Sequence, residues 1–340
     1  MKMLPAFSRN IPLTSGNDVS GVLIQRRFLA VSCCCMPVSR GTHIVILKWL
    51  DEHHQRTLQW LIADEMDDEK NTGVYRDQPE RISSLYSNLS IMDVTLICTI
   101  FEELPRQGPG TDESTVRACS CIPSSFRVGN ILDIGCGSGM QTLTLAKYFP
   151  ESQITASDIH QPFLDELRKR AKSAGLDKRI VPRQASMDNL PFEEKSFDLI
   201  WAEGSAFVMG LSNALGYWKT FLKPDGFLVF SDCTWFTDAP SEECREFMDT
   251  VCPDMPSESC TRELVRSAGF TVINSFRLPD EGWWTHYYSP LTERIPLLKE
   301  KYATNHDALD IIQGLEDEME IHRKYSKEYG YCFFINKNSE

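Results

Sequence analysis

The chain has 340 residues, of which 42% are hydrophobic and 24% charged, as is typical of a globular protein with a sizeable core. Its net charge of -13 disfavours nucleic acid as a partner, because contact with a phosphate backbone needs clustered Lys and Arg. No run of 18 apolar residues occurs, so we expect no membrane-spanning helix. The twelve cysteines lack zinc-binding spacings, so we expect reduced thiols and no metal site.

The first part of the chain, residues 1–85, has no clear hydrophobic period and no chemical motif. We interpret it as an N-terminal extension of unknown role, followed by one enzyme domain in residues 86–340, although the length also allows two domains. Arg26 and Arg27 bear a weak resemblance to a twin-arginine export signal. The apolar stretch after them is short, so we expect no export. The sequence carries no signal for the oligomeric state.

The domain opens with two expected helices. Apolar residues recur at helical spacing over residues 91–104 and end at Pro105. Residues 106–110 then form a turn that contains glycine and proline. Thr111 or Asp112 is expected to cap a second helix, because both side chains can accept hydrogen bonds from the first turn of a helix.

Short apolar strands then alternate with helices along the chain. This alternation is typical of a parallel sheet with helices on both faces. We therefore expect an α/β, Rossmann-like sheet of seven mostly parallel strands, with a helical insertion before the last strand. The expected strands are 130–134, 153–157, 179–182, 197–202, 226–231, 270–276 and 331–335, with helices at 139–149, 161–174 and near 213–222.

The turn after the first of these strands is a candidate binding site. The buried strand 131–134 runs into Gly135-Cys136-Gly137-Ser138-Gly139 and then into a helix. Glycines at the carboxyl end of such a strand let a ligand approach the backbone closely. Asp158 ends the next strand, nineteen residues beyond Gly139, where a carboxylate can accept both hydroxyls of a ribose. Repulsion from Asp158 disfavours a 2′-phosphate, so we expect an adenosine without one.

Two adenosine cofactors compete for this loop. NAD normally requires Gly-x-Gly-x-x-Gly, and here the third glycine, Gly139, comes one residue early. Asp133 lies two residues before Gly135, where its carboxylate would repel a pyrophosphate and attract an ammonium group. S-adenosylmethionine carries such an ammonium group and NAD does not. The residues therefore favour S-adenosylmethionine.

From about Ser87 the chain resembles the class I S-adenosylmethionine-dependent methyltransferases, in particular their small-molecule branch and its largely uncharacterised bacterial and archaeal members. Motifs in the order of that family carry the resemblance: 131–139, 157–159, 187–192, 196–200 and 222–226. The resemblance implies that the glycine-rich loop passes under the methionine part of the cofactor. The residues of that loop are Gly135, Cys136, Gly137, Ser138 and Gly139.

The resemblance also implies contacts for the rest of the cofactor. Asp158 would hold the ribose, and Ile159 would flank the adenine. Many relatives have an aspartate for the adenine amine at the position where this chain has Ser186. A hydroxyl can still form a hydrogen bond there, and Met187 and Asp188 are neighbours that can contribute.

The methyl acceptor is sought at the end of the fourth strand, where Glu203 faces the ligand crevice. Relatives that methylate nitrogens of bases or of glutamine carry Asn/Asp-Pro-Pro-Tyr there. The segment 201–205 lacks that motif, so the resemblance points to a small-molecule acceptor. A protonated acceptor would need a base, and the candidates are Glu203, Asp232 and His286. A cofactor-binding or structural role is the alternative for Glu203, and a structural role is the alternative for His286.

Two segments outside the sheet are candidates to cover the ligands. The insertion, residues 277–330, has roughly fifty residues and is interpreted as a lid. Arg106 and Gln107, in the turn that enters the domain, could clamp the cofactor carboxylate or an anionic substrate, with exposure to solvent as the alternative. Four aromatic side chains of the insertion form either a wall for the acceptor or a hydrophobic seam: Trp283, Trp284, Tyr287 and Tyr288.

The expected activity is methyl transfer to a small molecule in the cytoplasm, where this cofactor is made. The reaction is an in-line displacement that depends mainly on alignment. Two alternatives stay open. One is methylation of a protein or peptide, for which the acidic chain would favour basic partners. The other is a binding protein that retains the cofactor fold without turnover.

Overall fold

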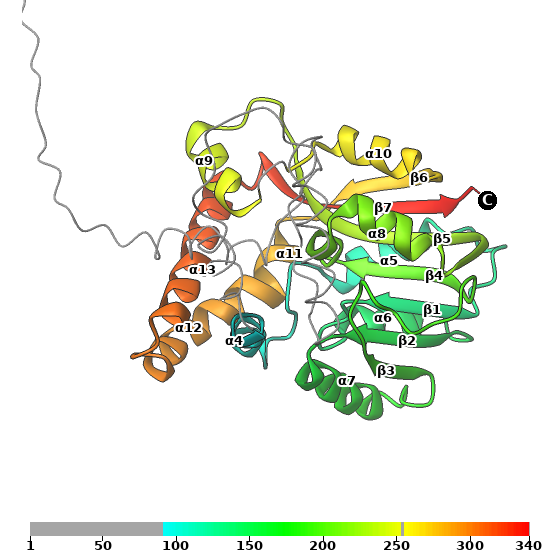
Figure 1. Cartoon of the computed structure of the whole chain (residues 1–340), viewed down its shortest axis with the longest axis horizontal. Helices are drawn as coiled ribbons and strands as arrows, with labels where there is room; N and C mark the ends of the chain where they lie inside the picture. Colours follow the sequence, from blue (N-terminus) through cyan, green and yellow to red (C-terminus); the bar gives the residue numbers. More distant parts are fainter. Residues whose placement is uncertain (1–90, 253–254, 340) are drawn as a thin grey trace, which may run out of the picture.

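The structure, a computed structural model, describes residues 91–252 and 255–339 (Figure 1). The expected N-terminal extension, residues 1–85, lies outside the described residues. Every cysteine within the described residues is a free thiol, and they contain no group of three or more potential metal ligands. In the same part of the chain, no helix combines the length and the apolarity needed to cross a lipid bilayer.

Seven strands of the described residues form one sheet in the order β3-β2-β1-β4-β5-β7-β6. β1 to β5 pair in parallel, and β7 runs antiparallel to both of its neighbours. This confirms the expected α/β sheet of mostly parallel strands. The strands are β1 (Asn130–Ile134), β2 (Gln153–Asp158), β3 (Ile180–Gln184), β4 (Phe197–Glu203), β5 (Leu222–Trp235), β6 (Phe270–Arg277) and β7 (Tyr329–Asn338).

Side chains alternate between the two faces of the sheet, as the two-residue period of a strand requires. In β1, Ile131 belongs to one apolar core and Leu132 to the other, and in β4 the same holds for Leu199 and Ile200. All four side chains are fully buried. Burial on both faces explains why these strands are nearly continuous apolar runs in the sequence.

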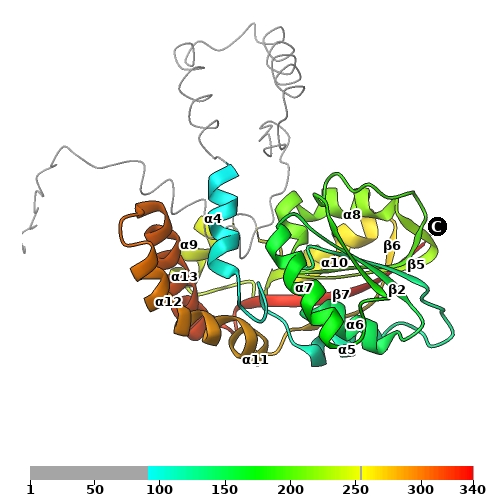
Figure 2. The same ribbon diagram turned by 90° about the horizontal axis from the view of Figure 1, so that it is seen from below.

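Helices cover both faces of the sheet (Figure 2). Thr111 caps α5 (Asp112–Ser120), because its hydroxyl oxygen accepts the N–H of Ser114 at 3.0 Å. On the face of the first core lie α5, α6 (Met140–Tyr148) and α7 (Gln161–Ser173). On the other face lie α8 (Leu211–Lys219), which follows the short 3-10 helix η2 (Ala206–Met209), and α10 (Glu258–Ser267).

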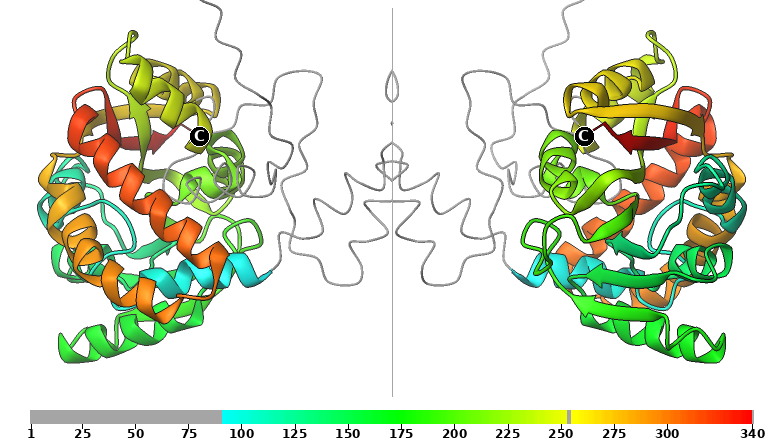
Figure 3. Two further views of the ribbon diagram at one scale, coloured as in Figure 1. Left: turned by 90° about the vertical axis from the view of Figure 1, so that its left-hand side faces the viewer. Right: turned by 90° about the vertical axis from the view of Figure 1, so that its right-hand side faces the viewer.

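A helical cap lies beside the edge of the sheet at which β4 ends, and α13 crosses this side of the molecule next to α4 (Figures 1 and 3). The buried side chains of the insertion, such as Leu291 and Ile312, join the first core, so the cap is packed onto the sheet. The cap consists of α4 (Ile91–Phe101), α9 (Glu242–Val251), α11 (Glu281–Trp283), the π-helix η3 (Trp284–Tyr288), α12 (Ser289–Lys301) and α13 (His306–Tyr325).

Three features of the fold differ from the sequence-based expectation, and one of them is that β7 extends over Tyr329–Asn338 although only 331–335 were expected. β5 extends over Leu222–Trp235, although only 226–231 were expected, because β4 pairs with it at Leu222 and β7 pairs with it from Phe227 to Trp235. The helices α9 and α10 were not predicted. Each has three or fewer buried residues, so its apolar pattern in the sequence is short.

Candidate functional site

The glycine-rich loop connects β1 to α6 in the conformation that its composition predicts. Gly135, Gly137 and Gly139 have φ angles of 68°, 53° and 83°, in the left-handed region that favours glycine. A Cβ atom on Gly139 would overlap the side chain of Leu167 in α7. The N–H groups of Gly135 and Cys136 donate to the carbonyl of Ser157, which holds the loop against the end of β2.

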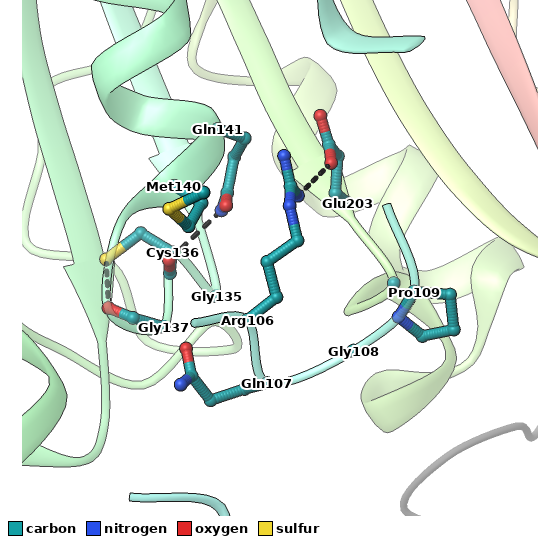
Figure 4. A pocket seen from close by; sticks show the side chains of 11 residues that line it. Arg106, Gln107, Gly108, Pro109, Gly135, Cys136, Gly137, Met140, Gln141 and Glu203 are labelled. Atoms are coloured by element: carbon teal, nitrogen blue, oxygen red, sulfur yellow. Dashed lines mark hydrogen bonds and ion pairs between the residues drawn. The ribbon is translucent and has the colours of Figure 1, made fainter. Parts of the chain in front are cut away.

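A partly open cavity lies above this loop (Figure 4). Three segments that are far apart in the sequence form its wall. They are the entry turn from Arg106 to Pro109, the loop and start of α6 with Gly135, Cys136, Gly137, Met140 and Gln141, and the end of β4 with Glu203 and Gly204. A concave site at the carboxyl edge of an α/β sheet is where such folds bind small ligands.

Arg106 is the main cationic group of the cavity, and its side chain is only 4% exposed. Its Nη1 lies 2.9 Å from Oε2 of Glu203, and its Nη2 lies 3.4 Å from a carboxylate oxygen of Asp112. Its Nε atom has no hydrogen-bond partner among the described residues. A buried N–H without an acceptor is costly, so Arg106 is suited to an anionic ligand group that supplies one.

Glu203 is engaged from two sides. Besides the ion pair with Arg106, its Oε1 accepts the hydroxyl of Thr115 at 2.6 Å and the indole N–H of Trp201 at 2.9 Å. The side chain is 3% exposed. These contacts support the structural alternative for Glu203. Its role as a base stays a prediction.

Asp133 is fully buried and lies behind the cavity wall. Its carboxylate accepts the hydroxyl of Thr142 at 2.5 Å, and Gln141 donates to it at 3.5 Å. Burial raises the pKa of Asp133 from 3.8 to about 7. Gln141 lines the cavity and Asp133 does not, so the expected contact of Asp133 with a ligand ammonium stays a prediction.

The raised pKa of Asp133 predicts a pH-dependent stability. Between about pH 4 and pH 7 the folded protein holds a proton on Asp133 that the unfolded chain has lost, so the free energy of unfolding falls as the pH rises. In the wild type we expect this fall in the free energy of unfolding to be on the order of a few kcal/mol, and in Asp133→Asn we expect it to be absent. Urea unfolding at about pH 5 and about pH 8 measures it. Asp249→Asn, which changes an exposed carboxylate, is the control. An equal change of the free energy of unfolding with pH in wild type and Asp133→Asn would contradict the expectation.

Asp158 links β2 to the glycine-rich loop. Its Oδ2 accepts the N–H of Gly137 and its Oδ1 accepts the N–H of His160, both at 2.9 Å. Desolvation by burial raises the pKa of Asp158, and these backbone hydrogen bonds oppose that effect. Carboxylate oxygens keep further lone pairs for ribose hydroxyls. Ile159 follows at the carboxyl end of β2, and its carbonyl accepts the side-chain N–H of Gln184 at 2.9 Å.

The segment expected at the adenine follows β3. The hydroxyl of Ser186 donates to Asp188 at 2.5 Å, and the carbonyl of Met187 accepts the indole N–H of Trp218 at 3.0 Å. The methyl group of Met187 lies 3.7 Å from the position of a Cβ atom on Gly135, so this segment is close to the loop. It does not line the cavity above the loop.

The other two candidate bases do not line the cavity either. Asp232 is 1% exposed on β5, where its carboxylate accepts the N–H of Cys233 at 2.9 Å. His286 is half-buried in η3, and its backbone carbonyl accepts the N–H of Arg106 at 3.3 Å. A catalytic role for Asp232 or His286 therefore stays a prediction.

The aromatic side chains of the insertion pack mainly against one another. Trp283 stacks on the buried His322 of α13, with ring centroids 4.1 Å apart, and its ring lies 5.0 Å from that of Tyr331. Tyr287 and Tyr288 are at most 1% exposed, and Trp284 is half-buried. These contacts support the hydrophobic seam. A wall for the acceptor stays a prediction.

Sequence reasoning missed three members of this aromatic cluster, His322, Tyr329 and Tyr331. The ring of Tyr331 lies 2.8 Å from the position of a Cβ atom on Gly204, which lines the cavity. The cluster is therefore adjacent to the cavity. Tyr331 was expected at the start of the last strand, but no local pattern indicated that it faces Gly204.

The residues from Pro105 to Gly110, which we call the strap, lie over the glycine-rich loop. The side-chain oxygen of Gln107 accepts the N–H of Ser138 at 2.7 Å, and the hydroxyl of Ser138 donates to the carbonyl of Pro105 at 3.3 Å. The expected alternative of solvent exposure does not describe Arg106, which is buried.

Comparison with known proteins shows consistent similarities. Residues 131–226 match the family described as a methyltransferase domain. The chain is 28% identical over 217 residues to the uncharacterized methyltransferase YodH of Bacillus subtilis, covering 60% of this chain and 82% of the relative. It is 27% identical over 146 residues to dimethylglycine N-methyltransferase of Parasynechococcus marenigrum, covering 42% of this chain and 52% of the relative.

Two solved structures share the fold. YjhP from E. coli superposes with a TM-score of 0.60 at 19% identity, covering 72% of this chain and 98% of that structure. A SAM-dependent methyltransferase from Thiobacillus denitrificans, solved in complex with S-adenosyl-L-homocysteine, gives a TM-score of 0.59 at 16% identity, covering 72% and 97%. At these identities the similarity concerns the fold.

Proposed function

Because the chain belongs to the class I S-adenosylmethionine-dependent methyltransferases, we propose that it transfers the methyl group of this cofactor to a small-molecule acceptor. The observation that carries the proposal is the cavity between the glycine-rich loop and the buried Arg106, whose Nε lacks an acceptor among the described residues. The carboxylate of the amino-acid tail would supply that acceptor. The residues present therefore fit the cofactor.

Each part of the cofactor has a candidate partner. Arg106 would hold the carboxylate, Gly135 and Gly137 would face the methionine part, and Asp158 would accept the ribose hydroxyls. The ammonium group would lie nearest Gln141, which connects the cavity to Asp133. Ile159 and the segment from Ser186 to Asp188 would border the adenine. When bound, S-adenosylmethionine supplies a methyl group on a positively charged sulfur.

The small-molecule acceptor is supported by residues at the end of β4. This position lacks the Asn/Asp-Pro-Pro-Tyr motif, and Glu203 is engaged by Arg106. The chain would contribute alignment and the exclusion of water, which an in-line displacement mainly needs. A cytoplasmic location and the absence of nucleic-acid partners are part of the proposal, and the net charge of -13 supports the latter.

Two measurements test the function. Isothermal titration with S-adenosylhomocysteine should show binding, and wild-type protein without binding heat would refute the proposal. Incubation with methyl-labelled cofactor and fractionated cell extract should then place the label in the small-molecule fraction. Label in protein would support peptide methylation instead, and binding without any transfer of label would support a cofactor-binding protein.

Arg106→Lys separates the carboxylate contact from the ion pair. Lysine can still pair with Glu203, but it lacks Nε and the planar fork that bind a carboxylate. We expect S-adenosylhomocysteine to bind about tenfold more weakly, which corresponds to ~1.4 kcal/mol. Binding of 5′-methylthioadenosine, which lacks the amino-acid tail, should change less than about twofold by the same scale. The exposed Arg168→Lys is the control for titration calorimetry, and equal losses for both ligands would contradict the assignment.

A further inference from the structure

The strap forms one wall of the cavity, and its position decides where the Arg106 guanidinium points. The cavity is lined by the strap from Arg106 to Pro109. Gln107 covers Gly137 so closely that a Cβ atom on this glycine would lie 2.5 Å from the Gln107 side-chain oxygen. Arg170 of α7 also donates to the carbonyl of Pro105 at 2.9 Å. A ligand in the cavity is therefore in contact with a strap that is held by its neighbours.

The insertion holds the strap at both ends of its cavity-lining part. The N–H of Arg106 donates to the carbonyl of His286 at 3.3 Å, and the N–H of Gly110 donates to the carbonyl of Gly282 at 2.9 Å. The two acceptor carbonyls are four residues apart, about one helical turn, so they lie on the same side of the α11–η3 segment. We call residues 281–288 the anchor turn.

The anchor turn is fixed to the rest of the cap. Trp283 stacks on His322 of α13, with ring centroids 4.1 Å apart, and meets Tyr331 of β7 edge-to-face at 5.0 Å. Tyr287 stacks on Phe101 at the end of α4, with ring centroids 5.9 Å apart. The anchor turn therefore moves only if the contacts with α4, α13 or β7 also change.

We propose that the anchor turn is a positioning element for the cofactor, which aims Arg106 at the carboxylate of the amino-acid tail by holding the strap. The inference rests on the proposed function and deepens it. It assigns the first part of the insertion to the cofactor side of the site, in addition to any contact with the acceptor. Disturbing the anchor turn then weakens binding of the tail and leaves binding of the adenosine part unchanged.

Gly282→Ala is the direct test. A Cβ atom on Gly282 would lie 2.7 Å from two side-chain atoms of Leu278, so either Leu278 or the anchor turn must shift, and Leu278, which is 5% exposed, is confined by its neighbours. The carbonyl that holds Gly110 belongs to the same residue and shifts with it. By calorimetry we expect S-adenosylhomocysteine to bind about tenfold more weakly, and 5′-methylthioadenosine to bind within about twofold of wild type.

Three further variants complete the test. Gly216→Ala, in α8, is the matched control because a Cβ atom there meets nothing within 4 Å, and both ligands should bind as to wild type. Combining Gly282→Ala with Leu278→Ala removes the overlap. The combination should bind S-adenosylhomocysteine within about threefold of Leu278→Ala alone. Trp283→Phe weakens the contacts of the anchor turn with His322 and Tyr331. It should lower the affinity for S-adenosylhomocysteine, but not for 5′-methylthioadenosine, to a smaller extent than Gly282→Ala, and it provides the test if Gly282→Ala does not fold.

The outcomes separate this inference from the proposed function. Wild-type protein that binds neither ligand refutes the proposed function, and the inference fails with it. Wild-type protein that binds both ligands, with Gly282→Ala and Trp283→Phe binding S-adenosylhomocysteine as tightly, refutes the inference alone. An equal loss of both ligands also refutes it, because a general disturbance does not discriminate the amino-acid tail.

Discussion

Asp158→Ala is expected to weaken the binding of S-adenosylhomocysteine and of 5′-methylthioadenosine alike, by about 100-fold. A hydrogen bond to a charged group contributes about 1.5–3 kcal/mol, and the carboxylate is proposed to accept two ribose hydroxyls. Each 1.4 kcal/mol corresponds to about a factor of ten in the dissociation constant. The variant also removes the acceptor for the N–H of Gly137, which loosens the glycine-rich loop.

Titration calorimetry with the two ligands measures this effect. Asp165→Ala changes an exposed carboxylate on α7 and should leave both affinities unaltered. Because the two ligands share the ribose, Asp158→Ala should differ from Arg106→Lys, which is expected to affect only the ligand with the amino-acid tail. Retained affinity for 5′-methylthioadenosine in Asp158→Ala would mean that Asp158 does not hold the ribose.

Glu203→Ala is expected to lower the free energy of unfolding by about 3–5 kcal/mol, the usual cost of removing one partner of a buried ion pair, because Arg106 then keeps only the half-exposed Asp112 at 3.4 Å. The side chains of Arg106 and Glu203 are 4% and 3% exposed, so solvent cannot replace the lost carboxylate. The hydroxyl of Thr115 and the indole N–H of Trp201 lose an acceptor as well. Urea unfolding at neutral pH measures the change.

Two comparisons sharpen this prediction. Replacing Arg106 and Glu203 together by leucine should cost less than Glu203→Ala, because no unpaired charge then remains in the interior. Saturating S-adenosylhomocysteine should recover part of the stability of Glu203→Ala, since its carboxylate can pair with Arg106. A loss of less than about 1 kcal/mol would instead be typical of a solvent-exposed pair. Glu203 would then be available for the catalytic role that the sequence left open.

Local patterns account for the parts of the fold that sequence reasoning predicted. β1 occupies Asn130–Ile134 as expected, because an apolar run that ends in glycines specifies both the strand and its end. Thr111 caps α5 as its side chain predicts. The length of β5 was underestimated, since its last residues become a strand through pairing with β7, which is about 100 residues away along the chain.

The candidate site, like the fold, has parts that the sequence indicated and parts that only the structure showed. The sequence indicated the glycine-rich loop, and its three left-handed glycines are found in the structure. It could not indicate on which side of β1 the Asp133 carboxylate is buried, because alternation along a strand does not distinguish the cavity from α6. Nor could it pair Arg106 with Glu203, which are 97 positions apart in the chain.

By itself, the sequence determined the order of the seven strands along the chain, although it missed α9 and α10. It also determined the strand–turn–helix with its glycines, the acid at the end of β2 and the resemblance to methyltransferases. Each of these depends on residue type and on spacing within a few turns of the chain. Only the tertiary structure decided that the strap is buried, that Glu203 holds Arg106 and that the insertion anchors the strap through Gly282 and His286. These contacts join segments separated by about 100 residues or more, and they form only when the packed core brings the segments together.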